Sequence, residues 1–143
     1  MRRDQLTADM FEIPMPASRT PGALAMGIQV RHQISEMLKE SPLSRYEIAA
    51  RMSELTGEEI SKHSLDSWTA ESRAGWRFPL EYLAALEVAM DTHALTIWNS
   101  AVRGCKTLVG REAIDAEMGK IKKQQLELSR REKALKKLLE GEP

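Results

Sequence analysis

From Ala23 onward, hydrophobic residues recur every three or four positions, which is the spacing of one face of an α-helix. The spacing predicts a first helix that runs from Ala23 until Pro42 ends it. A second helix is expected to start at Ser44, because Glu47 three residues later completes a Ser-x-x-Glu capping box. Gly57 can adopt a left-handed conformation, so we expect it to end this helix.

A short third helix is expected after Ser61, whose hydroxyl suits the N-cap position. Leu65 and Trp68 would share its inner face, so the more polar side chains should point outward. This helix is predicted to end before Gly75.

Two more helices complete the middle of the chain. Pro79 suits the first position of a fourth helix, and the fifth should cover residues 94–102 and stop at Gly104. Nothing between residues 23 and 110 has the alternation of a paired strand. The sequence therefore predicts an all-α domain over residues 23–110, with a core that includes Trp68, Phe78, Leu83 and Leu86.

Residues 1–22 precede this domain and contain prolines at positions 14, 16 and 21, which a helix cannot run through. One interpretation is a flexible or extended arm. The other uses its apolar residues: the arm would lie across its own domain or bind a protein partner through Met10, Phe11, Ile13 and Met15.

Residues 111–143 are predicted to form a long charged helix. A heptad pattern places apolar residues along one side, which favours a coiled coil and self-association. The residues of this oligomerisation seam are Ile114, Met118, Ile121, Leu128, Leu135 and Leu139. Gln125 and Glu132 interrupt the seam, so a solvated single helix is the alternative.

Composition narrows the class of protein. The 143 residues include one cysteine, Cys105, which excludes an intrachain disulfide and suits a reducing cytoplasm. No apolar run is long enough to cross a membrane, so we expect a soluble cytoplasmic protein. Basic and acidic residues balance at 21 each, and residues 41–75 carry four basic against six acidic residues. Any contact with DNA must therefore come from local placement of charge.

No catalytic arrangement is evident in the sequence. The histidines at 32, 63 and 93 lack the spacing of a metal site, and there is no glycine-rich phosphate loop. We therefore expect a non-enzymatic protein without a metal or cofactor.

The order of residues 43–90 resembles the λ-repressor and Cro-like class of helix-turn-helix domains. Ile48 and Ala49 match the apolar pair of the positioning helix, Leu65 the inward residue of the recognition helix, and Trp68 its terminal tryptophan. The proline-led fourth helix matches the one that closes the core. The arm and the charged tail also look like those of small regulatory proteins of bacteriophages and prophages, Mu-like ones in particular.

The chain departs from that class between its two central helices. Ala49 and Leu65 are sixteen positions apart, whereas about ten separate the matching residues in the class. The second helix or the turn after it must therefore be longer, which changes how the third helix is presented to DNA.

The resemblance implies a phage-type transcriptional regulator that binds double-stranded DNA as a homodimer. Its expected DNA-binding residues are Lys62, His63, Ser64, Ser67 and Arg73. Lys62 would contact phosphate, whereas His63 and Ser67 would face outward and read base edges. One alternative is a protein–protein adaptor or inhibitor that uses the same fold. Another is a small-terminase-like DNA-packaging component, which would form ring-sized oligomers.

Overall fold

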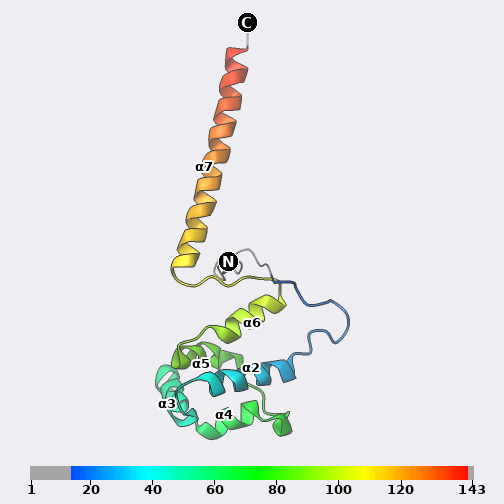
Figure 1. The fold of residues 1–143 in the computed structure, drawn as a ribbon, viewed down its shortest axis with the longest axis vertical. Coiled ribbons are helices and arrows are strands. Elements are labelled where there is room, and N and C mark those ends of the chain that lie inside the picture. The colour runs from blue at the N-terminus through cyan, green and yellow to red at the C-terminus, as the bar shows by residue number, and fades with distance from the viewer. Residues whose placement is uncertain (1–13, 142–143) are drawn as a thin grey trace, which may run out of the picture. The chain divides into compact units, whose positions relative to one another are not determined.

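A computed structural model describes residues 14–141, and within this range every regular element is helical (Figure 1). The chain divides into two compact units, residues 1–107 and residues 108–143. Five α-helices of the first unit gather around one core, and the second unit contains a single long helix. The predicted all-α class is therefore confirmed.

The described part of the N-terminal arm contacts its own unit. Residues 14–17 have no regular secondary structure, and the backbone N–H of Ala17 donates to the carbonyl of Val102 over 2.9 Å. Gly104 has a φ of +72°, and a Cβ at this glycine would meet the ring of Pro16 at 3.0 Å. The chain then loops away to α2 (Figure 1). Met10, Phe11 and Ile13 lie outside the described residues.

Helix α2 covers Gly27–Glu40, so it begins later than the predicted start at Ala23. The preceding residues form a turn in which Gly22 has a φ of +83°. Leu24 and Ile28 fit the helical spacing of the apolar residues, but both are exposed. The buried face of α2 is its later half, where Ile34, Met37 and Leu38 enter the core.

Helix α3 covers Arg45–Thr56 and has the predicted ends. The Ser44 hydroxyl accepts from the Glu47 backbone N–H, and the Glu47 carboxylate accepts from the Ser44 backbone N–H. These two bonds satisfy backbone donors that the helix start would otherwise leave unpaired. Gly57 closes the helix in the left-handed conformation.

Helix α4 covers Lys62–Thr69, with Ser61 as its N-cap as predicted. The long interval between Ala49 and Leu65 is divided between the end of α3 and the turn that follows it. Helix α3 continues to Thr56, well past Ala49, and residues 57–61 then lead into α4. Ile60 is buried in this turn, which fixes the turn against the core.

The fourth predicted helix begins later than expected. Pro79 is extended, Leu80–Tyr82 form the 3₁₀ turn η2, and α5 covers Leu83–Met90. Helix α6 covers Ala94–Val102, as predicted, and ends just before Gly104.

The core of the first unit draws on α2 to α6. It consists of Ile34, Met37, Leu38, Ile48, Ala49, Met52, Ile60, Leu65, Trp68, Leu86, Ala89 and Leu95. Of the four predicted core residues, Trp68 and Leu86 are buried, whereas Phe78 and Leu83 are only partly buried at its edge. Phe78 meets Trp68 edge-on, with ring centroids 5.3 Å apart.

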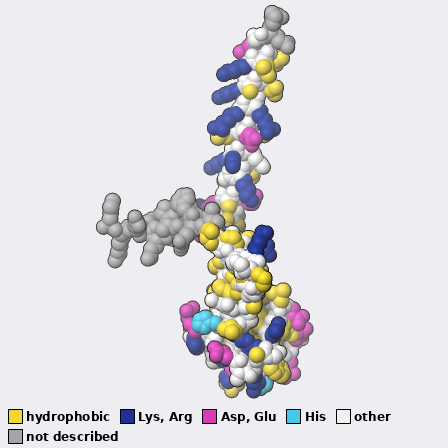
Figure 2. All heavy atoms as spheres, turned by 90° about the vertical axis from the view of Figure 1, so that its right-hand side faces the viewer, with side chains coloured by type: hydrophobic (Ala, Val, Ile, Leu, Met, Phe, Trp, Pro, Cys, Tyr) yellow, Lys and Arg dark blue, Asp and Glu magenta, His cyan; other side chains and the backbone are white. Residues whose placement is uncertain are grey.

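Helix α7 covers Arg111–Glu140 and forms the predicted continuous helix. It contains no buried residue. Ion pairs between residues three or four apart run along it, such as Lys120 with Glu117 and Arg131 with Glu127. Basic side chains and exposed hydrophobic side chains both project from the face of α7 in Figure 2.

Candidate nucleic-acid interface

The first turn of α4 carries three of the five predicted DNA-binding residues. His63 is exposed, and the Lys62 side chain is 37% exposed. Ser64 takes part in the cap: its backbone N–H donates to the Ser61 hydroxyl, and the two hydroxyls are 3.1 Å apart. The N-terminal end of α4 therefore offers one lysine and one imidazole to a partner, whereas the Ser64 hydroxyl already has a neighbour.

Asp66 lies one turn further along α4 and is flanked by two cations. Its carboxylate is 2.7 Å from Lys62 Nζ and 2.7 Å from a guanidinium nitrogen of Arg45. These hydrogen bonds and charges lower the pKa of Asp66, and the Asp66 carboxylate in turn raises the pKa of Lys62. Lys62 Nζ also lies 5.5 Å from the centre of the Tyr46 ring. Part of the positive charge of this surface is thus already balanced within the protein.

The ion pairs of Asp66 predict a pH dependence. A carboxyl group whose pKa falls on folding stabilises the native state above its ordinary pKa, here 3.8, and loses this contribution as the pH falls through the lowered value. Replacing Asp66 with asparagine should reduce stability at pH 7, and the difference from the parent protein should shrink below about pH 4. Urea unfolding at a series of pH values measures this difference. A difference that stays constant with pH would contradict the role of the Asp66 charge.

Ser67 does not face outward, so the predicted placement of its hydroxyl for base reading is wrong. Its side chain is 0% exposed, and its hydroxyl accepts a 2.7 Å hydrogen bond from Arg73. The helical period placed Ser67 opposite Leu65, but α2 contacts α4 from a second side. The helix is therefore buried on two sides, which a pattern with one inner face does not reveal.

Arg73 contacts His63 in the first turn of α4, so these two residues can bind the same partner. One guanidinium nitrogen donates to Ser67 and lies 3.3 Å from His63 Nε2. Arg73 belongs to the 3₁₀ turn η1, Glu71–Arg73, that follows α4. The structure thus brings Arg73 into contact with His63 and Ser67, whereas the Lys62 side chain pairs with Asp66 and the Ser64 hydroxyl lies beside Ser61.

Arg31 of α2 holds this turn in place and was not singled out from the sequence. Its guanidinium donates to the carbonyl oxygens of Ala70, Arg73 and Trp76 over 2.6, 2.9 and 2.9 Å. One side chain therefore fixes the segment that carries Arg73 against α2. The role of Arg31 could not be predicted from the sequence, because the carbonyl groups that accept its hydrogen bonds lie some forty residues away.

Tyr46 is a second residue that the sequence did not mark. It is exposed at the start of α3 and lines a shallow hollow of about 550 Å³ beside the first turn of α4. Ile60, Lys62 and His63 line the same hollow. Tyrosine and lysine side chains that line a hollow can both contact a phosphate group.

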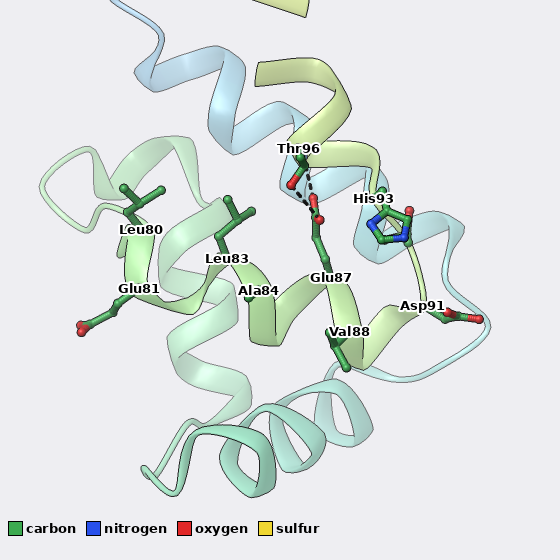
Figure 3. A pocket seen from close by; sticks show the side chains of 10 residues that line it. Leu80, Glu81, Leu83, Ala84, Glu87, Val88, Asp91, His93 and Thr96 are labelled. Carbon is green, nitrogen blue, oxygen red and sulfur yellow. Dashed lines mark hydrogen bonds between the residues drawn. The ribbon is translucent and has the colours of Figure 1, made fainter. Parts of the chain in front are cut away.

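A different hollow, of about 540 Å³, lies between η2, α5 and the start of α6 (Figure 3). Leu80, Leu83 and Val88 line it together with the buried Glu87. The Glu87 carboxylate accepts from the backbone N–H of Thr96 over 2.6 Å and from its hydroxyl over 2.9 Å, as the dashed lines in Figure 3 show. These bonds cap the first turn of α6, so the carboxylate has a structural role.

Neither hollow has the ligands of a metal site. Over residues 14–141, no group of three or more histidine, cysteine or acidic side chains could hold a metal ion. Cys105 is a free, exposed thiol. No helix within these residues has both the length and the apolar character needed to cross a membrane.

Comparisons with known proteins do not assign this chain to a family. No family model matches the chain, and searches of curated proteins and of solved structures each find no significant match. The resemblance to the λ-repressor and Cro-like class therefore rests on the residues and helices of this chain alone.

Proposed function

We propose that this protein is a DNA-binding transcriptional regulator of the phage or prophage type that acts as a dimer. The observation that carries the proposal is the cluster of Lys62, His63 and Arg73 at the first turn of α4, in which the exposed His63 lies 3.3 Å from a guanidinium nitrogen of Arg73. The order of a capped α3, a turn and a capped α4 supports it, because helix-turn-helix proteins contact base edges with the N-terminal residues of their second helix.

Each residue of this cluster has a distinct part in the proposal. His63 is exposed and has ring nitrogens that can donate to or accept from a base edge. Lys62 and Arg73 supply charge for phosphate or guanine. Ser67 positions Arg73 instead of contacting a base, and Arg31 holds the backbone around Arg73.

Asp66 works against DNA binding in this arrangement. Its carboxylate neutralises Lys62, which lies in the first turn of α4 that would approach the phosphates. Replacement of Asp66 by asparagine should therefore strengthen binding to every DNA sequence, even as it destabilises the fold. Replacement of Lys62 by alanine should weaken binding to every sequence and reduce the salt dependence by about one unit if Lys62 contacts a phosphate.

The test starts with recovery of bound fragments from a pool of genomic DNA, which supplies a specific site. Affinity for that site and for a scrambled one is then measured across a salt series for the Lys62→Ala, Asp66→Asn and His63→Ala proteins. His63→Ala should reduce the preference for the specific site by about ten-fold, the typical loss of one base contact. Lys120→Ala is a matched control, because Lys120 has a similar ion pair, with Glu117, on α7.

Two outcomes would contradict the proposal. If no DNA fragment is enriched, the protein does not read DNA through this surface. If Lys120→Ala weakens binding as much as Lys62→Ala does, the contact is not specific to α4.

The second candidate function is a protein–protein adaptor, and the surface of α5 favours it. Leu80 and Val88 are exposed beside the hollow that Glu87 and Thr96 line. Exposed apolar side chains around a hollow are typical of surfaces that bind another protein. Both Leu80 and Val88 are replaced by serine as a test. If this protein still binds DNA, the apolar surface is separate from the surface that binds DNA.

A further inference from the structure

Helix α7 exposes an apolar seam, interrupted at Gln125 and Glu132, that no described residue of its own unit covers. The six seam residues predicted from the heptads are each between 51% and 75% exposed. With 30 residues, α7 is also long enough for four heptads. The seam can therefore be buried by another helix of the same kind, and the charges beside it determine how that helix runs.

A parallel pair in register would bring like charges together. Glu132 occupies a core position of the heptad and would face Glu132 of the second copy. Arg131 and Lys136 occupy flanking positions that meet across a parallel pair, so they would repel each other twice. Glu117 with Lys122 is the one attractive pair of this arrangement.

An antiparallel pair avoids each of these conflicts. Its layers place Ile114 opposite Leu139 and Met118 opposite Leu135, so the two apolar ends of the seam cover each other. Glu132 then faces Ile121 instead of a second carboxylate. Asp115 and Lys136 meet across the seam at both ends, and no like-charged pair flanks the layers.

We propose that α7 pairs with α7 of a second copy of this chain in the antiparallel direction. The inference rests on the self-association of the proposed function and not on its DNA binding. The two α7 N-termini then lie about 45 Å apart, because a helix rises about 1.5 Å per residue. In a parallel pair they would lie about 10 Å apart, the usual separation of packed helices.

Reversing the charge of Lys136 distinguishes the antiparallel from the parallel dimer, because the dimer dissociation constant should rise in one and fall in the other. In the antiparallel dimer, Lys136→Glu places a glutamate opposite Asp115 at both ends and should raise the dimer dissociation constant about ten-fold. In a parallel dimer, the same change creates two attractive pairs with Arg131 and lowers the dissociation constant. Sedimentation equilibrium measures it in each variant.

Two further variants separate this effect from local changes in the helix. Lys136→Glu also removes the 2.8 Å ion pair with Glu132 of the same chain. The double variant Asp115→Lys with Lys136→Glu should nevertheless recover most of the lost affinity, because only an antiparallel dimer restores the opposite charges. Lys137→Glu changes the net charge equally but lies off the seam, so it should leave the dissociation constant within about two-fold of the parent protein.

A distance between labels gives an independent measurement. Spin labels on Glu112→Cys in a Cys105→Ser background should lie roughly 45 Å apart in the antiparallel dimer. Labels within about 20 Å of each other, or tighter association of the Lys136→Glu protein, would overturn the antiparallel direction alone. A parent protein that remains monomeric at all concentrations would overturn both the direction and the self-association.

Discussion

Replacement of Leu86 by alanine is expected to lower the free energy of unfolding of the first unit by about 2 to 5 kcal/mol. Leu86 is 0% exposed and belongs to the core, on helix α5, which contacts α3. Truncation removes buried methyl groups and leaves a cavity that the surrounding helices fill only in part. Urea unfolding followed by tryptophan fluorescence reports this change, because all three tryptophans belong to the first unit.

Two other positions of α5 provide the comparison. Val88 is 63% exposed, so Val88→Ala should change stability by less than about 0.5 kcal/mol. Leu83 is only partly buried, so Leu83→Ala should fall between Val88→Ala and Leu86→Ala. If Leu83→Ala were the most destabilising of the three, the face of α5 that enters the core would be assigned wrongly.

Replacement of Glu87 by alanine should lower the free energy of unfolding by about 1 to 3 kcal/mol, even though it removes a charge from the interior. The Glu87 side chain is 6% exposed, and its carboxylate accepts both the backbone N–H and the hydroxyl of Thr96. Without it, the first turn of α6 loses its acceptor and the favourable charge at a helix N-terminus. The same urea titration measures the loss.

Glu87→Gln is the matched control for this prediction. A glutamine can accept from the Thr96 N–H and donate to the Thr96 hydroxyl, so the hydrogen bonds remain while the charge is lost. The free energy of unfolding should therefore fall by less than half as much in Glu87→Gln as in Glu87→Ala. Equal losses in the two proteins would show that the charge, and not the hydrogen bonds, holds α5 and α6 together.

Local signals in the sequence determined where several helices begin and end. Ser44 with Glu47, the cap at Ser61 and the glycine at 57 each act through bonds or backbone angles within a few residues. Such features depend little on the rest of the fold. The long α7 was predictable for a similar reason, since residues 111–139 have a helical pattern with no proline to interrupt it.

Contacts between distant segments decided the remaining features. The burial of Ser67 depends on α2 and Arg73 closing over a second side of α4, and the role of Arg31 depends on carbonyl groups far along the chain. Glu87 sits in a strongly apolar helix, where nothing nearby in sequence indicated that its acceptor bonds would cap α6. The sequence by itself therefore determined the all-α class, both ends of α3, the capped start of α4, and the apolar seam of α7. Only the tertiary structure decided which polar side chains of the first unit remain available to a partner, because burial and hydrogen bonding depend on neighbours that the chain brings together only when it folds.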